Sequence, residues 1–147
     1  MGSTSADVIV LIKSFEGGKL PPNYCCFFAC FNRQWFFEAH EVLEKLWLVE
    51  RGRANADFFK GLIQLAGAFV HLQRNRMRPA GALFRLARAN LEKYPARQQG
   101  LDTWQVRTLI EDWLSELEAG EFAVNPLLLK PAPRLNLEDS FFPLPSQ

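Results

Sequence analysis

The chain has 147 residues, of which 48% are hydrophobic and 22% are charged, and its formal net charge at pH 7 is +1. This length fits one domain with a sizeable core and is too short for a TIM barrel or a two-lobed kinase. The mixed charges argue against disorder throughout, and the chain lacks the basic bias of many nucleic-acid-binding domains. We therefore expect a single soluble domain over residues 1–147.

Helical patterns account for most of the chain. A short helix is expected near residues 7–15, followed by a break at Gly17-Gly18 and Pro21-Pro22. Four longer helices are predicted over residues 32–50, 55–75, 79–94 and 102–120, with Asn32 and Asn55 as N-caps. No strand pattern is visible. The predicted fold class is all-α, a compact bundle of about four main helices with an extended, proline-rich C-terminal tail.

Two segments have a predicted place in the bundle. From Phe58 to Leu72 the only full charge is Lys60, which indicates a central helix surrounded by others. The tail, residues 123–147, combines five prolines with eight large apolar side chains. Proline prevents one long helix there, so we expect the tail to lie extended in a groove of the bundle or on a second subunit. Phe141 and Phe142 are its predicted anchors, and Leu127 to Leu129 would turn the chain back.

The compartment is expected to be the cytoplasm, because no secretory signal pattern and no membrane-spanning run is visible. The three cysteines, Cys25, Cys26 and Cys30, lie within six residues of an apolar stretch. An odd number of cysteines is no disulfide framework. We expect buried thiols that pack as small hydrophobic groups, with a redox or metal role as the alternative.

Polar side chains interrupt the apolar stripe of the first long helix. In the helix over residues 32–50, His40 and Glu44 fall within a stripe, and Glu41 lies at its flank. We expect His40 and Glu44 to be buried, with Gln64 nearest, because a buried carboxylate needs a partner. The cluster would fix helix register by hydrogen bonds, or form a ligand or metal pocket. The stripe consists of Phe36, Phe37, Leu43, Trp47 and Leu48; on the next helix Gln64 and His71 share a face beside Gly61, Gly67 and Ala68.

We expect neither a metal nor a cofactor. The segment from His40 to Glu44 lacks the second histidine of the zincin pattern, and no Glu-x-x-His di-iron signature or Gly-rich phosphate loop occurs. In a helical hairpin, His40 would lie level with Gln64, and His71 about 9 Å further along the axis at about 1.5 Å per residue.

Two linked motifs lie in these helices, in the same order along the chain. They consist of Phe31-Asn32, Phe36 to Glu44 with Trp47, Gly61 to Ala66, His71, Arg74 and Gly81-Ala82. Together they resemble the domain-of-unknown-function 309 family, and the resemblance covers roughly residues 31–94. It implies a small helical protein of bacteria, archaea or plastids, which would place a plant member in the plastid stroma, and it implies no reaction.

Charge alternates between segments. Residues 72–97 are strongly basic and residues 101–122 strongly acidic. We expect the two segments to face each other; the alternative is an anion-binding or RNA-binding patch. Trp35 and Trp104 are not interleaved with the arginines, so a nucleic-acid partner is not expected. The candidate anion-binding residues are Arg74, Arg76, Arg78, Arg85 and Arg88.

Three functions remain open. The first is a non-catalytic binding or scaffold module, as monomer or homodimer, whose partner is a protein or a small molecule; its candidate site is His40, Glu41, Glu44, Trp47, Gln64 and His71. The second is a small metal-dependent hydrolase that uses His40 and Glu44. The third is an anion or RNA binder that uses the arginines between Arg74 and Arg88. Whether the protein is an enzyme stays open.

Overall fold

Helices that follow one another in sequence also pack against one another in space. A computed structural model describes residues 5–138, which contain six α-helices and one short β-hairpin. The fold is all-helical as predicted, although the number of helices exceeds the predicted four. The helices are α1 (Ser5–Ser14), α2 (Pro22–Asn32), α3 (Phe36–Glu50), α4 (Ala56–Gln73), α5 (Met77–Leu91) and α6 (Thr103–Ala119); β1 (Arg97–Gln98) pairs antiparallel with β2 (Leu101–Asp102), and η1 (Pro126–Leu128) is one 3-10 turn.

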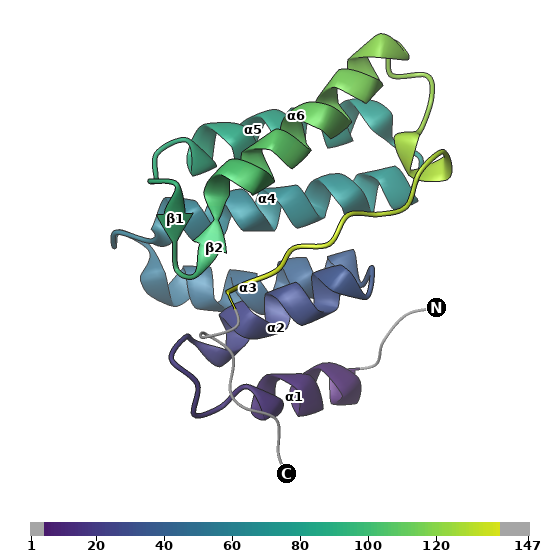
Figure 1. Cartoon of the computed structure of the whole chain (residues 1–147). Coiled ribbons are helices and arrows are strands. Elements are labelled where there is room, and N and C mark those ends of the chain that lie inside the picture. Colours follow the sequence, from purple (N-terminus) through teal and green to yellow (C-terminus); the bar gives the residue numbers. More distant parts are fainter. Residues whose placement is uncertain (1–4, 139–147) are drawn as a thin grey trace.

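The centre of the bundle is α4, as the nearly uncharged run predicts. It packs between α3 and α5, with α2 beyond α3 and α6 beyond α5 (Figure 1). Phe69 shows how the layers meet, because rings from four other helices surround it within 6 Å. These rings are Phe31 of α2, Phe36 of α3, Phe84 of α5 and Trp113 of α6.

The predicted N-terminal limit of the helix over residues 32–50 is wrong. Asn32 ends α2, and α3 begins only at Phe36. Pro22 opens α2, because proline is tolerated in the first helical turn. From Tyr24 to Phe31, every side chain except Ala29 is buried. An all-round buried helix has no polar face, so it shows no amphipathic period to predict it.

The other helix limits differ less. α5 begins at Met77 rather than Pro79 and ends before Pro95, as predicted. Asp102 caps α6, and its carboxylate accepts a hydrogen bond from the Gln105 N–H at 3.1 Å. The hairpin between α5 and α6 was not predicted, because its strands have two residues each. Gln99 and Gly100 have φ angles of 50° and 73°, which suit a tight hairpin turn.

The tail crosses the bundle as far as it is described. The buried Asn125 donates from Nδ2 to the Leu72 carbonyl at the end of α4, at 2.6 Å. After η1 the chain runs back across the bundle toward α2 (Figure 1). There Leu135 and Leu137 are buried in the core. Leu128 and Leu129 are exposed rather than packed, and Phe141 and Phe142 lie outside the described residues.

Candidate functional site

The buried face of α3 is rotated relative to the predicted stripe. Its buried residues are Phe36, Ala39, Val42 and Leu43, whereas Phe37 and Leu48 are 46% and 49% exposed. The predicted burial of the polar pair is therefore wrong. The His40 and Glu44 side chains are 32% and 45% exposed, and their nearest nitrogen and oxygen atoms lie 3.8 Å apart. Both side chains are therefore partly exposed to water, so Glu44 needs no buried partner.

A groove between α3 and α4 nevertheless brings most of the predicted site residues together. It has a volume of about 290 Å³. Its polar lining consists of His40 and Glu44 from α3 with Lys60, Gln64 and His71 from α4, and Arg74 follows α4. Phe37, Ile63, Val70 and Leu83 add apolar walls. The groove therefore offers charged and apolar contacts on one surface.

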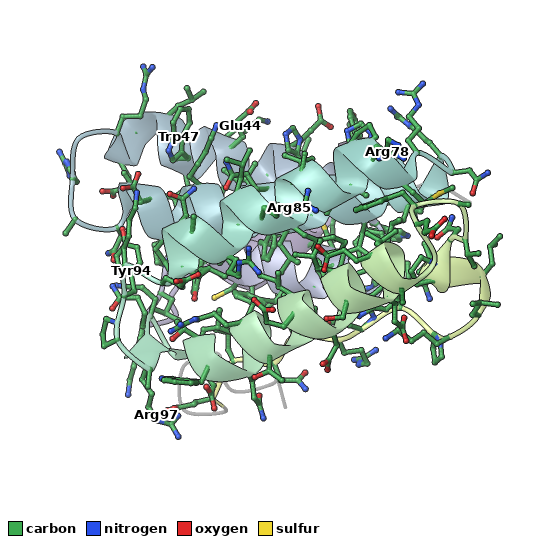
Figure 2. All side chains as sticks on the ribbon, turned by 90° about the horizontal axis from the view of Figure 1, so that it is seen from above. Glu44, Trp47, Arg78, Arg85, Tyr94 and Arg97 are labelled. Carbon is green, nitrogen blue, oxygen red and sulfur yellow. The ribbon has the colours of Figure 1, made fainter. Side chains whose placement is uncertain are left out.

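Glu41 and Trp47 lie beside this groove rather than in it. Glu41 lines a second groove, between α1 and α3. The Trp47 ring packs against Lys60, whose Nζ lies over the ring at 4.3 Å from its centroid. Figure 2 shows Glu44 and Trp47 along one edge of the molecule, with Arg78 near the opposite end. Lys60 was not predicted as a site residue. It lies seven residues before Gly67 and therefore on the same face of α4, and this spacing could have indicated it.

Gln64 is paired with α5 and not with His40 or Glu44. Its Oε1 accepts a hydrogen bond from Asn90 Nδ2 at 2.8 Å. Gly61 permits this contact, since a Cβ there would lie 3.2 Å from the Asn90 Cβ. The small residues of α4 thus allow a close approach of α5, and the prediction that Gln64 is nearest to His40 and Glu44 is not supported by any contact.

The two imidazoles share an unusual feature. His40 Nδ1 and His71 Nδ1 are buried and have no hydrogen-bond partner among the described residues. Burial lowers the pKa of His71, and the positive charges of Arg76 and Arg74 lower it further. His71 is therefore neutral near pH 7, with one ring nitrogen able to accept a hydrogen bond. Within residues 5–138, no three His, Cys, Asp or Glu side chains are grouped so that they could hold a metal ion.

The arginines divide into two sets. Arg88 bonds Glu111 at 2.7 Å, and Arg85 lies 3.4 Å from Glu118, so the basic and acidic segments do face each other across α5 and α6. Glu111 in particular raises the pKa of Arg88. By contrast, Arg74, Arg76 and Arg78 are exposed and form no ion pair within the described part of the chain.

The cysteines lie inside the core. Cys25, Cys26 and Cys30 are all buried, and the sulfur atoms of Cys26 and Cys30 lie 3.9 Å apart. Burial, with a contribution from Cys26, raises the pKa of Cys25 to about 11. The predicted packing as buried thiols is confirmed by their position.

The helices that form the groove lie in the part of the chain that matches a known protein family. In the described residues, no helix is both long and apolar enough to cross a membrane. Neither curated proteins nor solved structures give a significant match. Residues 24–90 match the model of the DUF309 family, a domain of unknown function, and this match spans α3, α4 and nearly all of α2 and α5. The resemblance to the DUF309 family seen in the sequence is therefore confirmed, and α2 belongs to the matching region.

Proposed function

We propose that the chain is a non-catalytic helical binding module whose α3–α4 groove receives a segment of a partner protein. The observation that carries this proposal is the lining of the groove. Glu44, Lys60 and Arg74 supply both signs of charge, and Phe37 and Leu83 supply apolar contacts. Interfaces combine such apolar contacts with a polar rim.

The size of the groove favours a protein segment over a small molecule. Its volume of about 290 Å³ lies at the lower limit of small-molecule sites, which typically have about 300–1,000 Å³. The neighbouring face of α3 extends the contact area, because Leu48 and Val49 are 49% and 68% exposed. Phe37, Glu44 and Leu48 fall on one helical stripe. An amphipathic helix of a partner could cover this stripe and enter the groove.

The test uses the full chain as bait in a pull-down from its native host. We expect one protein to be recovered with the wild type, and its recovery to be lost with His40→Ala/His71→Ala. The matched control is Leu128→Ala/Leu129→Ala, since these side chains are 80% and 75% exposed and lie away from the groove. Calorimetry with the purified partner should then show a ten-fold or larger loss of affinity for the groove variant alone.

Two results would overturn the proposal. Equal recovery with all three baits would place the interface elsewhere, and a recovered second copy of this chain would make the groove a homodimer contact. Stoichiometric zinc, iron or manganese that disappears in Glu44→Gln would instead support a metal-dependent enzyme. The neutral His71 could serve such a metal, but it lies on the other wall of the groove from Glu44.

A further inference from the structure

Two turns meet at one end of the bundle. The α2–α3 turn, residues 33–35, lies beside the α4–α5 turn, residues 74–76, and Gln73 Nε2 donates a hydrogen bond to the Gln34 carbonyl at 3.1 Å. A pocket of about 490 Å³ is lined by residues of the first turn, among them Arg33 and Trp35, and by Gln73 at the end of α4. Residues that are about 40 positions apart in sequence therefore form one surface, which we call the arginine end.

Positive charge gathers at the arginine end. Arg33, Arg74 and Arg76 are all exposed, and among the described residues none has a carboxylate partner within 4 Å. Glu38 is the acidic side chain that lines the same pocket. Burial lowers the pKa of His71, and the positive charges of Arg76 and Arg74 lower it further. The surface is thus suited to an anion with several charges.

Aromatic side chains accompany two of these arginines, since Trp35 lies beside Arg33 and Phe37 lines the α3–α4 groove together with Arg74. The Arg33 guanidinium carbon is 5.4 Å from the centroid of the Trp35 ring. Phe37, 46% exposed, lines both this pocket and the α3–α4 groove, and its ring stacks with His40. The sequence did not indicate this mixture, because residues 33–35 fell inside a predicted helix. The turn places Trp35 in the lining of one pocket with Gln73, which directly precedes the α4–α5 turn.

We propose that the arginine end binds single-stranded nucleic acid, with phosphates on the arginines and a base on Phe37. Arginine binds phosphate through a planar fork of donors, and an exposed aromatic ring stacks on a base of any sequence. An acidic peptide would use the arginines but gain nothing specific from the ring. This binding activity lies beyond the proposed protein contact, and it requires neither His40 nor His71.

The test measures fluorescence anisotropy of a labelled oligouridylate of about ten nucleotides, a length within the usual site sizes. The test variant is Arg33→Gln/Arg76→Gln, since neither residue lines the α3–α4 groove. The matched control is Arg51→Gln/Arg53→Gln, which removes the same charge from the exposed α3–α4 turn at the other end of the helices. All variants are first compared by circular dichroism and thermal unfolding.

We expect wild type and control to bind alike and the test variant to bind at least ten-fold more weakly. The slope of log K against log salt should fall in magnitude by about 1.4 in the test variant, because each phosphate contact on a single strand contributes about 0.7. Phe37→Ala should weaken binding by about five-fold or more with an unchanged slope. Oligothymidylate should bind like oligouridylate.

Three outcomes would overturn this proposal. Wild type that does not bind the oligonucleotide at about 50 mM salt, where phosphate contacts are strongest, would remove its basis. Equal weakening in the test variant and the control would show attraction to general positive charge. Tighter binding of a polyglutamate peptide than of the oligonucleotide would show an acidic-peptide site. Each outcome leaves the partner test of the α3–α4 groove unaffected, because that test changes His40 and His71.

Discussion

Asn32 joins the C-terminal tail to α2, and replacing it by alanine tests whether that contact stabilises the fold. Its Nδ2 donates to the Leu135 carbonyl at 2.8 Å, and its Oδ1 accepts from the Leu135 N–H at 2.7 Å. The side-chain amide thus pairs both backbone groups of a residue that is 103 positions away. The Leu135 side chain is only 4% exposed, so the tail is held close to the core here.

The expected loss follows from these two bonds. Each hydrogen bond contributes about 0.5–1.5 kcal/mol net, and an unpaired buried polar group costs about 1–3 kcal/mol. Both bonds are only partly buried, so water can solvate part of what the mutation exposes. We therefore expect Asn32→Ala to lower the free energy of unfolding by about 2–3 kcal/mol. For a domain of this size that corresponds to a fall in Tm of about 5–10 °C.

Urea unfolding followed by circular dichroism gives the free energy, with Asn23→Ala as the matched control. Asn23 donates one hydrogen bond, from Nδ2 to the Val42 carbonyl at 2.9 Å, so its loss should cost about 1 kcal/mol. If Asn32→Ala unfolds at the same urea concentration as the wild type, or loses no more than Asn23→Ala, the tail contact contributes nothing and the reasoning is refuted.

Three further predictions concern titratable groups. At about pH 8.5, where a free cysteine is half ionised, Cys25 should resist alkylation until the protein unfolds, since its pKa is raised to about 11; rapid labelling of Cys25 itself in the native protein, located by peptide mass spectrometry, would contradict this. The pKa of His71 in the folded protein lies below its ordinary value of 6.5. Protonation of His71 therefore favours the unfolded state, and the free energy of unfolding should decrease as pH falls below about 6.5. NMR should show that the pKa of His71 rises in Arg74→Gln/Arg76→Gln. Glu44→Ala should change the free energy of unfolding by no more than about 1 kcal/mol in urea, because the side chain is 45% exposed.

Helices with a strong local signal could be predicted from the sequence. α6 has a regular apolar period and a capping aspartate at Asp102, and its observed limits agree with the prediction. α4 was placed at the centre because it has almost no charge, and its ring contacts confirm that position. In both cases the signal lies within one segment, so no knowledge of neighbouring helices is needed.

The orientation of α3 could not be predicted in the same way. Phe37 and Leu48 are large and apolar but exposed, whereas the small Ala39 is fully buried. A hydrophobicity pattern weights large side chains and therefore rotates the expected buried face toward them. α2 and α4 determine which face of α3 is covered. His40 and Gln64 line one groove, but the predicted burial of His40 and Glu44 is wrong for this reason.

Neighbouring helices also determine which arginines of residues 74–88 form ion pairs. Arg85 and Arg88 are three residues apart on α5, so they share the face that meets the acidic α6. Arg74 and Arg76 lie in or beside the α4–α5 turn, where no acidic helix stands opposite among the described residues. One basic stretch of sequence is therefore divided in space, into cations that hold two helices together and cations that remain available for a ligand. A charge count along the sequence cannot separate them, since the separation depends on where α5 begins.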